Sequence, residues 1–359
     1  MSVTRRLSLR AAAAALLFFL PSQGWAAAET MIDPVSGSEI LTARPAEPSI
    51  SGDYLAGIFA SEQQDLRAAA RFLLVVQAAN PEDAALRSAT FLTAAAAGVM
   101  GEAIRLAPQI AEGDQAKGIA RLVLLADHAV QGRWADAQAE ARQLQAQGIT
   151  GATRALLLAW TTLEPGGLAA AQVELDALAP LSSLGVLYHL HRALLSDAAG
   201  DKAAAAADYE QALAASEQRS VRLVLLIANF RARNGDMAGA KALLGDYMTE
   251  QPGSAIVADS LAALEAGAVP APVVANAQEG LAEVFFQVGS ILAQESASDS
   301  ALIEGQLARH MKPSFDAASV LLGELAQKRK QRLDAIDAFS AVPEDSPYHS
   351  TASLGLAEE

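Results

Sequence analysis

Side chains that commonly bind metals or transfer protons are few in this sequence, which has five histidines and no cysteine among 359 residues. His189 and His191 are two residues apart on an expected helix, so they point to different faces and cannot share one metal ion. No His-x-x-x-His pair occurs, and His128, His310 and His349 are isolated. The sequence therefore predicts no metal site.

Motifs for nucleophilic or phosphate chemistry are also missing. There is no Gly-x-Ser-x-Gly elbow, no glycine-rich phosphate loop ending in Lys-Ser/Thr and no dinucleotide fingerprint. The acidic pair Glu344 and Asp345 falls in an expected loop, where solvated charges are common. Lys328–Arg332 is a dense basic run in an expected turn, and it is either solvated or a docking point for acidic groups. We expect a non-enzymatic protein without a cofactor.

The overall charge restricts the class of partner. Lys and Arg total 26 against 41 Asp and Glu, which gives a formal net charge of -15. Because such a chain repels phosphate backbones, we do not expect nucleic acid as a partner. Hydrophobic residues make up 52% of the chain and charged residues 19%, a composition that favours a large folded core over disorder.

The N-terminus has the three parts of a secretory signal peptide. Arg5, Arg6 and Arg10 form a positive start, Ala11–Leu20 is an unbroken apolar run, and Ala26–Ala28 supplies small residues for cleavage. A run of this length is too short to span a bilayer, which needs about 20 apolar residues. The N-terminus is therefore expected to direct export rather than to anchor the chain.

We expect residues 1–28 to be removed on export and the mature protein to lie in the periplasm without a membrane span. Thr4–Arg10 resembles a twin-arginine motif, but Ser8 stands where an apolar residue is usual, so the general and twin-arginine routes both stay open. Residues 29–49 contain three prolines and several small polar residues, which predicts a flexible leader.

The rest of the chain repeats glycine and alanine at a fixed period. Gly98, Gly132, Gly166 and Gly200 are evenly spaced, and Gly235 continues the series one residue late. Alanine follows each of these glycines by five residues. A regular spacing of this length indicates a repeated supersecondary unit.

We interpret the unit as two antiparallel helices joined by a turn. Glycine allows the positive φ that ends the first helix, and alanine lets the two helices cross closely. Pro81, Pro252, Pro313 and Pro347 each follow an alanine of this kind by twelve residues and are expected to stop the second helix.

This pattern resembles the tetratricopeptide repeat (TPR) family, whose unit of about 34 residues matches the spacing of the glycines. The best single match is Leu333–Phe339 followed by Pro347, although the tryptophan usual near the start of the unit is absent. The resemblance implies an all-α protein, a right-handed α-solenoid of about eight helix–turn–helix units with the last one incomplete. Repeats are expected to begin near Ile50, Ala84, Gly118, Ala152, Val186, Val221, Ala282 and Asp316.

The expected organisation is six repeats in residues 50–254, an irregular helix and Pro-rich joint in 255–281, and two further repeats with a truncated helix in 282–359. Gly267–Pro272 must be extended, because a residue before proline avoids the helical region. The joint is either a loop within one continuous solenoid or a flexible connection between two short ones. Because the truncated helix has no following helix, we expect a longer parent protein or a partner at this end.

In TPR proteins the first helix of each unit lines a concave groove, and its positions 2, 5, 9 and 12 face the ligand. Here positions 5 and 9 are mostly apolar, beginning with Tyr54 and Ile58 in the first repeat. The resemblance implies a partner-binding groove formed by Leu122, Leu156, Trp160, Leu190, Leu194, Arg222, Leu225 and Asn229. A register shift of one or two residues would instead place this stripe in the core between helices.

These features favour an exported interaction scaffold or chaperone-like adaptor in the envelope of a Gram-negative bacterium. Its expected partner is a protein or peptide segment that is apolar or amphipathic, with basic flanks that complement the acidic chain. Two alternatives stay open. One is an accessory subunit of a membrane-associated secretion or assembly machine, and the other is the repeat arm of an enzyme whose catalytic domain lies beyond Glu359.

Overall fold

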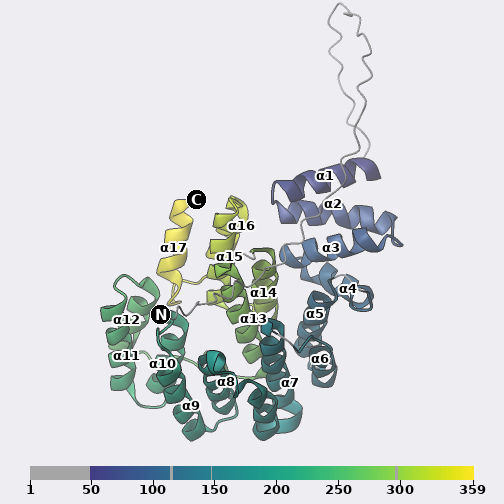
Figure 1. Ribbon diagram of the computed structural model, residues 1–359. Helices are drawn as coiled ribbons and strands as arrows, with labels where there is room; N and C mark the ends of the chain where they lie inside the picture. Colours follow the sequence, from purple (N-terminus) through teal and green to yellow (C-terminus); the bar gives the residue numbers. More distant parts are fainter. Residues whose placement is uncertain (1–48, 114–115, 147, 296–297) are drawn as a thin grey trace, which may run out of the picture. The chain divides into compact units, whose positions relative to one another are not determined.

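Alanine- and leucine-rich segments form α-helices throughout the part of the chain that the structure describes. The computed structural model describes residues 49–113, 116–146, 148–295 and 298–359. The expected signal peptide (1–28) and all but the last residue of the expected leader (29–49) lie outside these ranges. No strand occurs within them, which confirms the predicted all-α class (Figure 1).

Eight helix pairs form the repeats in the described residues. The first helices of the pairs are α1 (Ile50–Glu62), α3 (Ala84–Ala96), α5 (Lys117–Val130), the first part of α7 (Gly148–Leu175), α8 (Gly185–Ala198), α10 (Val221–Arg233), α13 (Ala277–Gln294) and α15 (Asp316–Lys328). The second helices are α2 (Leu66–Ala79), α4 (Met100–Ala111), α6 (Trp134–Arg142), the remainder of α7, α9 (Lys202–Ala215), α11 (Met237–Glu250), α14 (Ser298–Met311) and α16 (Arg332–Ser340). α12 (Ala255–Glu265) and α17 (His349–Glu358) are single helices, and the short 3-10 turns Asp176–Leu178 and Ser182–Leu184 precede α8.

The turns of the repeats use glycine much as the period predicts. Gly98, Gly132 and Gly200 have φ values of 73°, 71° and 84°, in the left-handed region that favours glycine. In the fourth repeat the prediction was wrong by one residue, because Gly167 has the positive φ (75°) and interrupts α7. Gly166 still belongs to the first part of α7, and Gly167 forms the turn.

The alanines of the repeating series lie at the crossings between helices. None of the eight has any exposed surface: Ala69, Ala103, Ala137, Ala171, Ala205, Ala240, Ala301 and Ala335. Larger side chains here would push the two helices apart. Three of the second helices are also capped, since Asp65, Asp201 and Asp236 accept hydrogen bonds from backbone N–H groups three residues on.

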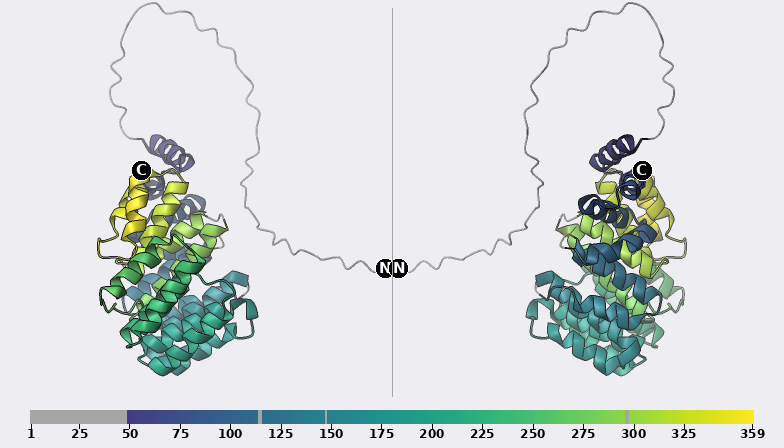
Figure 2. Two further views of the ribbon diagram at one scale, coloured as in Figure 1. Left: turned by 90° about the vertical axis from the view of Figure 1, so that its left-hand side faces the viewer. Right: turned by 90° about the vertical axis from the view of Figure 1, so that its right-hand side faces the viewer.

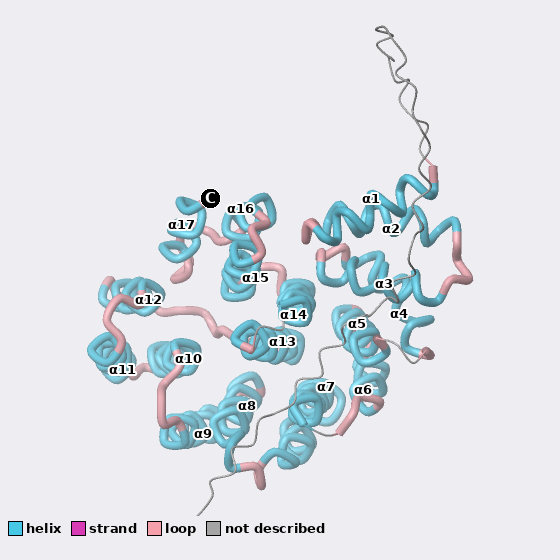
Figure 3. The backbone as a smooth tube through the Cα atoms, turned by 45° about the horizontal axis from the view of Figure 1, so that its top comes forward, coloured by secondary structure: helices cyan, strands magenta, loops and turns pink. Residues whose placement is uncertain are grey.

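The last two repeats return to the inner side of the first six. After α12, residues 266–276 contain no helix and lead into α13, which packs against α5, α7 and α8. α14 packs against α3 and α5. Figure 3 shows α13 and α14 inside the arc formed by the earlier helices. The Pro-rich segment therefore turns the second set of repeats onto the first.

Contacts between distant parts of the sequence join the ends of this helical unit. Arg67 of α2 pairs with Asp334 (2.8 Å) and Asp337 (2.6 Å) of α16. α17 packs on α12 and α15. A continuous hydrophobic core extends from Phe91 to Ala338, and a smaller cluster surrounds Phe339. Among the described helices, none combines the length and apolar character that crossing a bilayer requires.

Candidate functional site

Five of the residues predicted to line a partner groove are core residues. Leu122, Leu156, Trp160, Leu190 and Leu194 have at most 9% of their surface exposed. They lie on α5, α7 and α8, the helices against which α13 packs. For these five residues the structure shows the inter-helix core, the second of the two alternatives left open by the sequence. Their role in partner binding stays a prediction that would require α13 to move.

A series of buried and partly buried hydrogen bonds connects the arc to α13. The Trp160 indole donates to Nδ1 of His191 (3.0 Å), and Nε2 of His191 lies 3.3 Å from Oε1 of Gln287. The Gln287 amide then donates to Glu283 (2.9 Å). Because an indole N–H can only donate, Nδ1 must accept, which assigns the His191 proton to Nε2. A neutral imidazole therefore satisfies both hydrogen bonds of His191.

The surroundings of His191 favour that neutral form. Its side chain has no exposed surface. Burial lowers the pKa of His191 to about 4, and the attraction of the nearby Glu283 carboxylate opposes this only partly. His191 therefore acts at neutral pH as an uncharged link between α8 and α13.

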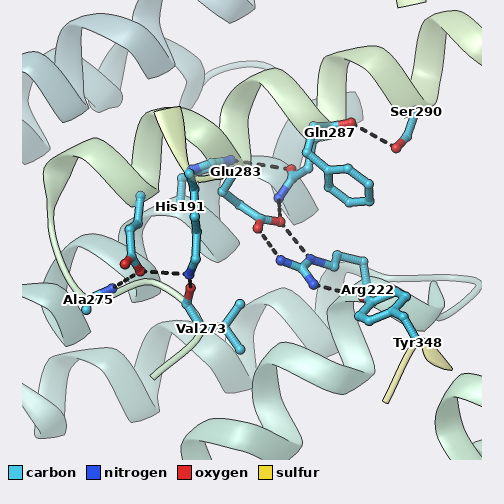
Figure 4. Close-up of polar contacts among 11 residues, drawn as sticks. His191, Arg222, Val273, Ala275, Glu283, Gln287, Ser290 and Tyr348 are labelled. Atoms are coloured by element: carbon cyan, nitrogen blue, oxygen red, sulfur yellow. Dashed lines mark hydrogen bonds and ion pairs between the residues drawn. The ribbon is translucent and has the colours of Figure 1, made fainter. Parts of the chain in front are cut away.

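Glu283 of α13, the last acceptor in this series of hydrogen bonds, also forms an ion pair with Arg222 of α10 (Figure 4). The guanidinium contacts both carboxylate oxygens and also donates to the Tyr348 hydroxyl (2.9 Å). It lies 5.2 Å from the ring centres of both Phe286 and Phe315. Burial alone would raise the pKa of Glu283, but the Arg222 guanidinium outweighs it and holds that pKa below its usual value.

The other two predicted groove residues, Leu225 and Asn229, line a pocket together with Arg222. This cavity of about 140 Å³ lies between α10, α12 and the Pro-rich segment. The Asn229 amide donates to the backbone carbonyl of Ala271 (2.8 Å). Lys312 likewise donates to the carbonyl of Val273 (2.8 Å). Arg222 and Asn229 are the two polar residues that the sequence assigned to a peptide ligand. Within this structure they bind the chain's own side chains and backbone instead.

An exposed apolar surface lies on α1 and includes Tyr54 and Ile58, which the sequence placed at groove positions of the first repeat. Five large side chains face solvent there, and we call them the α1 stripe: Ile50 (43% exposed), Tyr54 (45%), Leu55 (68%), Ile58 (38%) and Phe59 (64%). The opposite face of α1 buries Gly57 and Ala60 against α2. Figure 2 shows α1 at the edge of the helical unit. Tyr54 and Ile58 occupy positions 5 and 9 of the first repeat, which was the available signal.

The charged residues of α1 itself are acidic. α1 carries Asp53 and Glu62 and no basic residue. An apolar stripe next to acidic groups suits a segment with an apolar face and basic neighbours. Elsewhere in the described residues, no cluster of three or more His, Cys, Asp or Glu side chains could hold a metal ion.

Comparisons with known proteins find structural similarity only. No family model and no curated protein matches the sequence. A chain of the APC/C hetero-tetramer Cut9-Hcn1 is similar at 11% identity and a TM-score of 0.34, with 84% of this chain and 54% of that chain covered. A chain of the Naa15/Naa10 complex bound to HypK-THB is similar at 15% identity and a TM-score of 0.32, with 67% and 39% covered.

A tetratricopeptide repeat protein from Parabacteroides merdae is similar at 15% identity and a TM-score of 0.29, covering 86% of this chain and 97% of that chain. Our chain thus spans about half the length of the first of these structures and 39% of the second. The assignment of the fold rests on the helix pairs of the chain itself.

Proposed function

We propose that this chain is a non-catalytic scaffold of the cell envelope that binds a partner protein through the α1 stripe. The occupant is an apolar or amphipathic helical segment with basic flanks. The observation that carries the proposal is the exposure of five large apolar side chains on one helix, α1, each between 38% and 68% exposed. Contiguous apolar surface of this kind usually marks an interaction site.

Within the described residues, α2 is the element that packs extensively against α1, and the α1 stripe stays exposed there. In a stack of helix pairs, each pair buries its apolar face on the next one, and α1 belongs to the first described pair. A helix from another protein would pack there as a further unit of the stack, in the same way that amphipathic helices enter apolar grooves. Asp53 and Glu62 would attract basic flanks, and the chain's net charge of -15 acts in the same direction.

The envelope location is part of the proposal and is supported by the predicted signal peptide at residues 1–28. N-terminal sequencing of the protein from a periplasmic fraction tests it directly. We expect the mature chain to begin near Glu29. A chain that keeps Met1 and stays in the cytoplasm would overturn the location.

Site-specific photo-crosslinking tests the binding face. A benzophenone amino acid placed at Phe59 is expected to crosslink a second protein in intact cells, and peptide mapping should locate the crosslink in an apolar or amphipathic segment flanked by Lys or Arg. The matched control is the same amino acid at Val173 of α7, which is 71% exposed and lies outside the α1 stripe. Crosslinking at both positions alike would mean non-specific contact and would overturn the proposal.

A second variant separates binding from folding. Leu55→Asp places a charge in the α1 stripe, where Leu55 is 68% exposed, so circular dichroism should be unchanged while the crosslink at Phe59 is lost. A crosslink between two copies of this chain would show self-association instead of a separate partner. Retention of the crosslink in Leu55→Asp would show that the stripe does not bind the partner.

A further inference from the structure

A pocket of about 310 Å³ lies between the arc and the seventh repeat, α13 and α14. Its wall is formed by aliphatic side chains from α5, α13 and α14 and from the turn after α6. These are Ile119, Leu122, Leu144, Val288, Leu292 and Ile303. Cavities of this size with mostly apolar walls are typical of small-molecule sites. The rim includes Gly118 and Ser300, which are exposed and give access from solvent.

One carboxyl group lines this apolar pocket. Glu304 of α14 is 7% exposed, and its Oε2 atom has no hydrogen-bond partner. It is the one ionisable side chain among the described residues that line the pocket. Gly289 of α13 lets α14 approach, because a β-carbon there would lie 3.2 Å from Cβ of Glu304. Two helices thus hold an unpaired acid beside the aliphatic wall.

A buried carboxyl oxygen without a hydrogen bond is costly, and no described residue pairs with Oε2 of Glu304. Burial raises the pKa of Glu304 to about 8, so the group is mostly protonated at neutral pH. The two acids of α13 differ, since the buried Glu283 is paired with Arg222 and the partly exposed Glu279 with Lys312. No packing or ion-pair role within the described residues accounts for an acid at position 304.

We propose that this pocket binds a small amphiphilic amine, with its ammonium group against Glu304 and its alkyl chain along the aliphatic wall. Binding would transfer the Glu304 proton to solvent and leave a carboxylate–ammonium pair in place of the unpaired acid. An anionic ligand would be repelled once Glu304 ionises, and an alcohol would gain a hydrogen bond without forming an ion pair. The proposal is independent of the α1 stripe.

Calorimetric titration of the mature chain with octylamine at pH 7 tests this assignment. We expect saturable binding with release of close to one proton per amine, measured from the binding enthalpies in two buffers of different ionisation enthalpy. Affinity should rise about fourfold for each CH2 from butylamine to octylamine. Octanol should bind at least tenfold more weakly than octylamine.

Variants assign the binding to the pocket. Glu304→Gln should weaken octylamine binding at least tenfold and abolish proton release, while leaving octanol binding unchanged. The matched control is Glu265→Gln, which replaces an exposed acid on α12 and should bind octylamine like the wild type. Leu292→Phe should fill part of the cavity and weaken octylamine more than butylamine. Thermal melts would establish that each variant is folded.

Several results would overturn the proposal. One is the absence of octylamine binding to the folded wild type at millimolar concentration. Another is equal affinity of the wild type and Glu304→Gln, which would place the amine elsewhere. A lysine side chain of a partner protein presents the same ammonium group on a four-carbon chain. If butylamine binds as tightly as octylamine, the pocket takes that shorter group and the amphiphile is excluded.

Discussion

Gly280 of α13 lies so close to the indole ring of Trp160 on α7 that a β-carbon at position 280 would overlap the ring. Both residues are buried. The absence of a side chain at 280 therefore sets how deeply α13 packs into the arc. The same indole donates the first hydrogen bond of the chain that leads to Glu283. Packing and polar contacts thus fix α13 at one place on the inner side.

Gly280→Ala should accordingly destabilise the fold. The added methyl group must displace either the Trp160 ring or α13, and overpacking of this kind costs about 1–3 kcal/mol. Urea denaturation followed by circular dichroism would measure the loss. The control is Gly245→Ala in α11, where an added β-carbon meets nothing within 4 Å and alanine favours the helix. Equal effects of the two substitutions would contradict the packing assigned to Gly280.

The Arg222–Glu283 pair should show strong coupling in a double-mutant cycle. Removing either partner leaves a buried charge without its counterion, so Arg222→Met or Glu283→Leu alone should cost about 3–5 kcal/mol of unfolding free energy. The double variant removes both charges and should recover most of that loss. Additive losses in the double variant would show that the two side chains act independently. Tryptophan fluorescence during urea denaturation provides the measurement.

The local features of the fold follow from the sequence because each repeat encodes its own turn and crossing. Glycine is needed where φ is positive, as at Gly132 and Gly200, and alanine is needed where helices cross. Both requirements act within one unit, so they recur with the period of the unit. The expected starts at Ile50, Ala84 and Val221 coincide with the first residues of α1, α3 and α10.

The return of α13 into the arc could not be predicted in the same way. His191 and Gln287 are far apart in the sequence, and neither their residue types nor their spacing predicts that they are in contact. The apolar residues at positions 5 and 9, such as Leu156 and Trp160, suit either an exposed groove or a core. Periodicity reports contacts between neighbouring repeats, whereas α13 contacts repeats that are distant in sequence. Gly280 is the residue in α13 that permits the close approach to Trp160. A single glycine within a helix has several possible explanations, so the sequence alone does not predict this contact.

Leu156→Asp should therefore unfold or severely destabilise the protein. Leu156 is 1% exposed, and an unpaired charge there has no compensating partner, so we expect a loss of more than about 4 kcal/mol with reduced helicity. Leu55→Asp introduces the same charge on the exposed α1 stripe and serves as the control, with a change within about 0.5 kcal/mol. Circular dichroism and thermal melts distinguish the two. A fully helical and stable Leu156→Asp variant would show that the inner face is open.

The low pKa of His191 predicts a specific loss of stability in acid. Its pKa is about 4 in the folded chain and about 6.5 when unfolded, so the unfolded state binds the proton first as the pH falls. The stabilisation of the folded state by neutral His191 is complete well above pH 6.5 and declines as the pH falls towards 4. Between pH 7.5 and 5 the wild type should lose about 2 kcal/mol more than His191→Gln, because glutamine does not titrate. Urea denaturation at both pH values measures the difference, and parallel losses in the two proteins would contradict it.

Glu304 predicts the opposite pH dependence. Its folded pKa of about 8 lies above the ordinary value of 4.5, so the folded state retains a proton that the unfolded state releases. The resulting stabilisation is complete only below about pH 4.5, and it is lost as the pH rises towards 8. Glu304→Gln removes the titration while keeping the shape of the side chain.

The variant should consequently become more stable than the wild type as the pH rises. From pH 5 to pH 8 the advantage of Glu304→Gln is expected to grow by about 3.5 kcal/mol, while Glu265→Gln on the exposed side of α12 should follow the wild type closely. Urea denaturation without any amine present gives these values. Since the same buried acid is proposed to pair with an amine, added octylamine should restore wild-type stability at pH 8 and leave Glu304→Gln unchanged. A constant difference between the two proteins across this range would mean that Glu304 ionises freely and that its surroundings are wet.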